Sequence, residues 1–238
     1  MSAETGPGPL ALVGSGEYLP EMLEVESSLI EGRAPRYVQL ATAAYNDGPS
    51  VVEHWHQLGA TQAKRIGVEA VAVPVGTRED ANNADLAALI EGAGLIYLSG
   101  GDPHYLANTL RDTLVWAAIE RTWRSGAALA GCSAGAMAIG SWIPSIRHPR
   151  SAATSGLGLL PRLGILPHFD AFAARVPDVV ARFVLPDESA TSIYGIDELT
   201  ALVGGPSEWT IEGHASVWHL TPHGRREFKV GEHVSTPS

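Results

Sequence analysis

Short apolar runs alternate with helix-forming stretches along the first 140 residues of the chain. The apolar runs are continuous, without intervening polar residues, and they end in Gly, Ser, Asp or Thr. Continuous apolar strands are typical of a parallel sheet that helices cover on both faces. The pattern therefore predicts an α/β three-layer sandwich with a mostly parallel central sheet. We expect strands at 9–13, 36–40, 68–75, 94–98 and 127–130, and helices at 18–31, 50–58, 85–91 and 103–124.

The pattern changes after residue 139. A loop is expected over 141–150, an extended segment over 163–168 and a helix over 172–183. Short strands separated by Gly and Pro follow, and they predict a meander added to the sheet edge. No internal repeat or linker is visible, so 1–238 is predicted to be a single domain with residues 1–8 disordered. The meander strands are expected at 192–196, 200–203, 209–211, 215–220 and 227–230.

Composition narrows the possible partners. The formal net charge is −10 and no basic stripe is present, which argues against nucleic acid or an anionic membrane as a partner. No apolar run approaches the roughly 18 residues that a membrane-spanning helix needs. The single cysteine, Cys132, excludes an internal disulfide and is typical of a reducing compartment. With no signal-peptide pattern at the N-terminus, the sequence predicts a cytoplasmic protein.

The stretch 127–140 carries the most specific chemical pattern. Its sequence, AALAGCSAGAMAIG, reads as an apolar strand, a Gly-x-Ser-x-Gly turn and a helix-forming run. Such a turn exposes the serine hydroxyl at the end of a sheet, and its glycines remove side chains that would collide. Ser133 is therefore the candidate nucleophile, with the N–H of Ala134 as one oxyanion donor. A small-residue turn without catalytic function is equally compatible with the pattern taken alone.

A serine nucleophile needs a base, and the base needs a group that orients it. Of the nine histidines, His168 stands out because it follows an extended apolar run, an environment that favours a neutral imidazole. A core histidine bonded to backbone is the alternative. The adjacent acids Asp197 and Glu198 lie between apolar strand residues, and only one of them can face His168 because neighbouring strand residues point to opposite faces. Spacing leaves that choice open.

An α/β-hydrolase arrangement is the rival reading of the same serine. Its chain order is Ser, acid, His, which Ser133, Asp197 and either His214 or His219 would satisfy. In that fold several strand–helix units follow the serine, whereas this chain continues with short strands. We therefore rank this arrangement low.

Several segments together resemble the serine exopeptidase family of dipeptidase E (aspartyl dipeptidase) and cyanophycinase. The resemblance implies a class I glutamine amidotransferase-like, or flavodoxin-like, fold. It also implies Ser133 as nucleophile, His168 as general base, Glu198 as the orienting acid, and Gly101 and Ala134 as oxyanion donors. The segments that carry it are Ser99-Gly100-Gly101-Asp102, Gly131-Cys132-Ser133-Ala134-Gly135-Ala136, Gly156-Leu157-Gly158-Leu159-Leu160-Pro161, Pro167-His168-Phe169 and Gly195-Ile196-Asp197-Glu198-Leu199-Thr200-Ala201-Leu202.

The expected function is that of a serine hydrolase that cleaves small peptides or amides without metal or cofactor, as a monomer or homodimer. The resemblance leaves aspartyl specificity open, because Asp102-Pro103 stands where dipeptidase E has Asn-Thr. Two alternatives remain: an amidotransferase-like enzyme that uses Cys132, and a non-catalytic small-molecule-binding protein on the same fold. Candidate substrate contacts are Asp102, Arg147, His148 and Arg175, with Arg150 as a further arginine able to meet a carboxylate.

Overall fold

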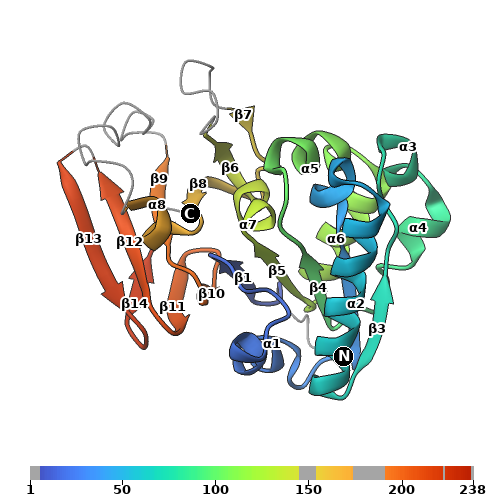
Figure 1. The fold of residues 1–238 in the computed structure, drawn as a ribbon, viewed down its shortest axis with the longest axis horizontal. Coiled ribbons are helices and arrows are strands. Elements are labelled where there is room, and N and C mark those ends of the chain that lie inside the picture. Colours follow the sequence, from blue (N-terminus) through green and yellow to red (C-terminus); the bar gives the residue numbers. More distant parts are fainter. Residues whose placement is uncertain (1–5, 145–153, 174–190, 222, 237–238) are drawn as a thin grey trace.

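The chain folds into two β-sheets with helices packed around them (Figure 1). The structure, a computed structural model, describes residues 6–144, 154–173, 191–221 and 223–236. An eight-stranded sheet has the order β14-β11-β10-β1-β5-β4-β2-β3, and a six-stranded sheet has the order β13-β12-β9-β8-β6-β7. Among the described residues no helix combines the length and the apolar character needed to cross a membrane.

The central sheet contains a run of five parallel strands, as the apolar pattern predicted. Three antiparallel strands continue the sheet beyond β1. The parallel strands are β1 (Leu10–Val13), β5 (Ala128–Cys132), β4 (Leu95–Leu98), β2 (Arg36–Leu40) and β3 (Glu69–Ala72). The antiparallel strands are β10 (Thr200–Gly204), β11 (Glu208–Gly213) and β14 (His233–Ser235).

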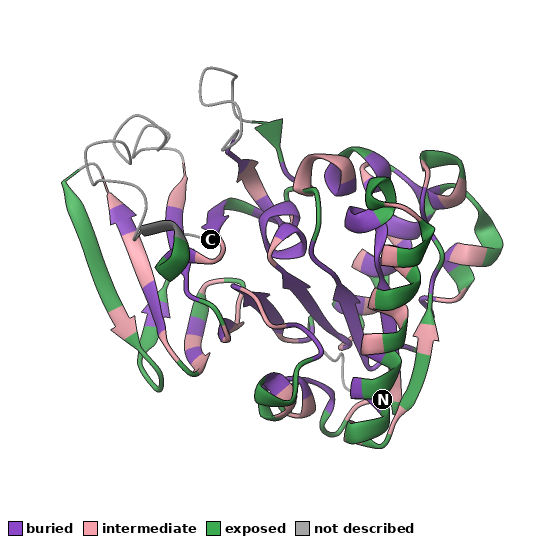
Figure 2. Cartoon of the chain, viewed as in Figure 1, coloured by how far each residue is buried: buried purple, intermediate pink, exposed green. Residues whose placement is uncertain are grey.

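Successive residues of the central strands pack into different hydrophobic clusters, which makes the sheet the middle of three layers. Leu10 and Leu12 join one cluster, whereas Ala11 and Val13 join the other. Residues of α1 (Leu23–Ile30) and α2 (Pro49–Ile66) pack into the second cluster. The first cluster takes in α3 (Arg78–Ala81), α4 (Ala84–Ala88), α5 (Pro103–Leu110), α6 (Leu114–Arg124) and α7 (Ala134–Ile139). Figure 2 shows the central strands buried between these layers.

The second sheet holds three of the late strands and three earlier ones. Strands β6, β8 and β9 run parallel to one another, and the other three are antiparallel to their neighbours. Residues from β6, β8, β9 and β12 belong to the same hydrophobic cluster as one face of the central sheet. The strands are β6 (Gly140–Ile143), β7 (Thr154–Ser155), β8 (Leu160–Leu166), β9 (Ser192–Ile196), β12 (Ser216–Thr221) and β13 (Gly224–Lys229).

The late strands are present where the sequence predicts them, but they do not form one meander at one edge. The chain passes from β9 in the second sheet to β10 and β11 in the central sheet, returns for β12 and β13, and ends with β14 in the central sheet. These crossings matter for the site, since the connection from β9 to β10 lies between the two sheets.

Several predicted boundaries are wrong for local reasons. The helix expected over 103–124 is two helices, because Asp112 adopts φ 56° and the Thr113 hydroxyl accepts from the Trp116 N–H to begin α6. Part of the loop expected over 141–150 is strand β6. Gly8 is ordered, since its N–H donates to the Trp123 carbonyl at 2.9 Å and its carbonyl accepts from the indole N–H.

Helix α8 (Phe169–Ala173) overlaps the first residues of the helix expected over 172–183. Residues 174–190 lie outside the described part of the chain.

Helix α1 carries a buried carboxyl group. Glu26 on α1 is 1% exposed, and its two oxygens accept from the Tyr18 N–H at 3.0 Å and the Tyr37 hydroxyl at 2.7 Å. Burial raises the pKa of Glu26 from 4.5 to about 7, more than its hydrogen bonds lower it. The folded protein therefore holds this proton more tightly than the unfolded chain does.

This pKa shift predicts a pH-dependent loss of stability. The protonated carboxyl contributes fully below about pH 4.5, and the contribution is lost as pH rises through about 7. Relative to Glu26→Gln, the free energy of unfolding of the wild type should fall by about 2 kcal/mol between pH 5 and pH 8. Urea unfolding of both proteins at four pH values checks this, and a constant difference between them would contradict it.

Candidate active site

Ser133 is the single residue between strand β5 and helix α7, and its backbone is strained. It adopts φ 48° and ψ −108°, a conformation that side-chain-bearing residues rarely take. A Cβ on Gly131 would lie 2.5 Å from the Gly135 carbonyl carbon, and a Cβ on Gly135 would lie 2.2 Å from the Leu98 oxygen. Both positions therefore require glycine, because the helix starts in direct contact with the strand ends.

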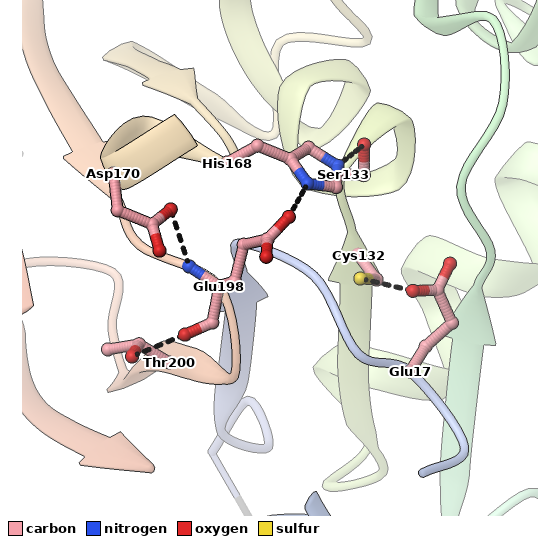
Figure 3. Close-up of polar contacts among 7 residues, drawn as sticks. All are labelled: Glu17, Cys132, Ser133, His168, Asp170, Glu198 and Thr200. Atoms are coloured by element: carbon pink, nitrogen blue, oxygen red, sulfur yellow. Dashed lines mark hydrogen bonds and ion pairs between the residues drawn. The ribbon is translucent and has the colours of Figure 1, made fainter. Parts of the chain in front are cut away.

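Ser133, His168 and Glu198 form a continuous chain of hydrogen-bonding contacts (Figure 3). Ser133 Oγ lies 3.1 Å from His168 Nε2, and His168 Nδ1 lies 2.9 Å from Glu198 Oε1. A neutral imidazole with its proton on Nδ1 donates to the carboxylate and leaves Nε2 to accept the serine proton. The structure thus brings together the three residues that the resemblance assigned to catalysis.

The second sheet supplies His168, and the crossing between the sheets supplies Glu198. His168 follows β8 after one intervening residue and adopts φ 51°. Glu198 lies in the connection between β9 and β10. Both side chains are about half exposed, at 44% and 48%. This exposure argues against the alternative of a core histidine at position 168, and it lets water reach the imidazole.

Asp197 points away from His168, which answers the question that spacing left open. Its carboxylate accepts from the Ser216 N–H at 3.2 Å and from the Trp218 indole N–H at 3.0 Å. Burial raises the pKa of Asp197, with these hydrogen bonds opposing the shift. Asp197 therefore anchors β12 and takes no part in the chain of contacts at Ser133.

The histidines of the α/β-hydrolase alternative are also engaged elsewhere. His214 Nε2 lies 3.1 Å from the Glu21 carbonyl oxygen, and the ring of His219 stacks on Tyr194 at 4.8 Å. Neither histidine is bonded to Ser133 in the structure, so the alternative order of residues is not assembled.

The turn that contains Gly101 packs against the serine turn. An ideal Cβ on Gly100 would lie 3.4 Å from Ser133 Cβ, so the two turns are in contact. On its other side Gly101, at φ 140°, meets the backbone of Ala43, whose carbonyl accepts from the Asp102 N–H at 2.8 Å. Ala134 is the first residue of α7, so its N–H has no acceptor within its own helix.

Of the expected substrate contacts, Asp102 lies in the described part of the chain. Asp102 caps helix α5, because its carboxylate accepts from the His104 and Tyr105 N–H groups at 2.9 and 3.1 Å. Its side chain therefore already has a structural role. Within the described ranges no cluster of three or more metal-binding side chains occurs. The remaining candidates, Arg147, His148, Arg150 and Arg175, lie outside the described residues.

Comparison with known proteins places the chain in a family. The sequence model of peptidase family S51 matches residues 10–210. The chain belongs to peptidase family S51.

Relatives and solved structures agree with this assignment. Cyanophycinases of Trichormus variabilis and of a Nostoc species are each 30% identical to the chain over 169 residues, which is 67% of this chain and 56% of theirs. The chain thus spans little more than half of their length.

A peptidase from an acI-B1 Actinobacterium superposes with a TM-score of 0.89 at 42% identity, covering 98% of both chains. A putative peptidase E from Listeria monocytogenes gives a TM-score of 0.63 at 15% identity, covering 88% of this chain and all of its own, which supports the fold.

Two acids beside the S51 site escaped the sequence analysis. Asp170 Oδ1 accepts from the Glu198 N–H at 3.2 Å, which joins the segment of His168 to the segment of Glu198. Glu17 is buried and contacts both Gly100 and Cys132. Nothing in their local pattern separates these acids from solvated ones, although Glu17 does follow Gly14-Ser15-Gly16 at a strand end.

The contact between α7 and β4 predicts a strict requirement for glycine. Gly135→Ala should lower the free energy of unfolding by about 2 kcal/mol or more, because the new methyl group overlaps the Leu98 carbonyl. Gly6→Ala is the control, since a Cβ there meets nothing within 4 Å. Thermal and denaturant unfolding measure both variants, and equal stability of the two would contradict the prediction.

Proposed function

We propose that this protein is a serine peptidase that cleaves small peptides or amides through an acyl-enzyme, without a metal or cofactor. Ser133 is the nucleophile, His168 the general base and Glu198 the acid that orients the imidazole. The observation that carries the proposal is the pair of contacts from Ser133 Oγ to His168 Nε2 and from His168 Nδ1 to Glu198 Oε1, at 3.1 and 2.9 Å.

In the first step Ser133 Oγ attacks the scissile carbonyl carbon while its proton passes to His168 Nε2. Glu198 accepts from Nδ1 throughout and stabilises the imidazolium that forms. The tetrahedral intermediate then collapses, the C–N bond breaks, and the departing amine takes the proton from Nε2. The product of this half-reaction is an ester between the acyl group and Ser133.

In the second step water takes the place of the amine. His168 removes a proton from the water, which attacks the ester carbonyl, and the same proton returns to Ser133 Oγ as the acid leaves. The partial exposure of His168, 44% of its side chain, allows water to reach the imidazole.

We assign the stabilisation of the negative charge that develops on the carbonyl oxygen to the N–H groups of Gly101 and Ala134. Donors of this kind are effective because they are held in place before the charge appears. Support comes from the packing of the Gly100–Gly101 turn against Ser133 and from the start of α7 directly after Ser133.

The environment of Cys132 argues against an amidotransferase-like reaction at that residue. Its side chain is fully buried and its thiol donates to Glu17 Oε2 at 2.8 Å. Burial raises the pKa of the thiol well above its usual range, and the nearby Glu17 charge raises it further. A thiol that stays protonated is a poor nucleophile.

Labelling with a fluorophosphonate probe separates the candidate functions. We expect the wild type and Cys132→Ala to be labelled and Ser133→Ala to be unlabelled, because His168 contacts Ser133, whereas the Cys132 thiol is buried and stays protonated. Labelling that is lost in Cys132→Ala and kept in Ser133→Ala would favour the amidotransferase-like reading. An unlabelled wild type would favour a non-catalytic binding protein.

The neighbouring acids Glu198 and Asp197 provide a matched test of which residue orients His168. Glu198→Gln should slow labelling of Ser133 by about 100-fold or more, because the amide can donate to Nδ1 and force the wrong tautomer. Asp197→Asn should label at close to the wild-type rate, since Asp197 faces Trp218. Second-order labelling rate constants measure both, and similar rates for the two variants would contradict the assignment.

We propose a peptide or amide bond as the bond that is cleaved. The named relatives include cyanophycinases and peptidases, which supports this class of bond. Hydrolysis of a dipeptide and isopeptide library, with Ser133→Ala as the control, would identify the preferred bond.

A further inference from the structure

Glu17 is a buried acid that the proposed reaction does not use. It lies beyond the end of β1 and is 6% exposed. Its Oε1 accepts from the Gly100 N–H at 2.8 Å, and its Oε2 accepts from the Cys132 thiol at 2.8 Å. Figure 3 shows Glu17 directed toward Cys132, below the serine.

Each of the two donors lies next to a residue of the proposed site. Cys132 immediately precedes Ser133, and Gly100 immediately precedes Gly101. One carboxylate therefore joins the end of the strand that carries the nucleophile to the turn that carries a proposed oxyanion donor. We propose that Glu17 is a positioning residue that sets the distance between the Gly101 N–H and Ser133. This inference rests on the proposed function.

Only a carboxylate satisfies both donors equally. Gly100 and Cys132 are both buried, so each donor would lack a partner if Glu17 were removed. The fit is also close, because a Cβ on Gly100 would lie 2.9 Å from Glu17 Oε1. The high pKa of the Cys132 thiol, which burial causes, keeps the proton on sulfur that the contact requires.

Backbone hydrogen bonds hold the outer side of the Gly100–Gly101 turn and the serine turn, and Glu17 adds a side-chain link on the inner side. The Asp102 N–H donates to the Ala43 carbonyl at 2.8 Å and ties the outer side of that turn to the segment after β2. The Ser133 N–H donates to the Val13 carbonyl at 2.9 Å and ties the serine to β1. Glu17 follows Val13 by four residues, so it connects the ends of β1, β4 and β5.

This role predicts a specific kinetic signature. An oxyanion contact becomes strong only as charge develops, so its misplacement slows the reaction without weakening initial binding. With a fluorophosphonate probe on the full chain, Glu17→Ala should lower the maximal labelling rate constant about 10- to 100-fold and leave the half-saturating probe concentration within about two-fold.

Two variants serve as controls. Glu17→Gln should recover most of the rate, because its amide oxygen still accepts from the Gly100 N–H. Glu21→Ala, an exposed acid on the same segment, should label as the wild type does.

If Glu17→Ala does not fold, Glu17→Asp replaces it. The shorter side chain cannot reach both donors, so the folded aspartate variant should show the same fall in rate. A folded variant that labels at the wild-type rate would overturn the inference.

Hydrogen exchange tests the contact without relying on activity. The Gly100 amide should be protected in the wild type and should exchange faster in Glu17→Ala or Glu17→Asp, while β2 (Arg36–Leu40) keeps its protection. Unchanged exchange at Gly100 would overturn the inference alone. A wild type that is not labelled at Ser133 would overturn the proposed function and this inference with it, so the two failures are distinguishable.

Discussion

The site depends on a close approach of backbone to backbone at the ends of β4 and β5. Gly131 and Gly135 contact each other, and Gly135 also contacts the Leu98 carbonyl, without room for a methyl group. This packing leaves one residue, Ser133, to turn the chain from strand to helix at φ 48°. The cost of that conformation is offset by the burial around it, since every residue of β5 and α7 is buried. The serine hydroxyl is thereby held at the sheet end, in reach of His168.

The second sheet and its connection to the central sheet bring two further side chains to Ser133. Strand β8 carries His168 to the end of the central sheet, and the passage from β9 to β10 carries Glu198 from one sheet to the other. Two further contacts hold these segments in place: Asp170 with the Glu198 N–H, and Asp197 with Trp218. The neighbouring acids Glu198 and Asp197 thus have different contacts. Glu198 faces the imidazole, and Asp197 binds Trp218 of the second sheet.

Buried acids on the other face of the central sheet have distinct environments. Glu26 is surrounded by tyrosines, and its pKa rises to about 7 because burial outweighs its hydrogen bonds. Glu17 instead accepts from a backbone N–H and a thiol directly below the serine. Glu26 bears mainly on stability, whereas the contacts of Glu17 lead to the Gly100–Gly101 turn that packs against Ser133.

The sequence by itself determined the parallel part of the central sheet, because strands buried on both faces must be continuously apolar, as Leu10–Val13 and Leu95–Leu98 are. It also marked Ser133 as a candidate, since glycines at 131 and 135 leave out the side chains that would collide where a strand turns directly into a helix.

Tertiary structure alone decided the rest. The division of the late strands between two sheets depends on long-range pairing, which short strands such as Thr200–Gly204 do not encode in their own pattern. The different contacts of Glu198 and Asp197, and the links made by Glu17 and Asp170, depend on side chains that meet residues 19 or more positions away in the chain. Local spacing carries no information about such meetings, because it is the packing of the two sheets that sets the distances.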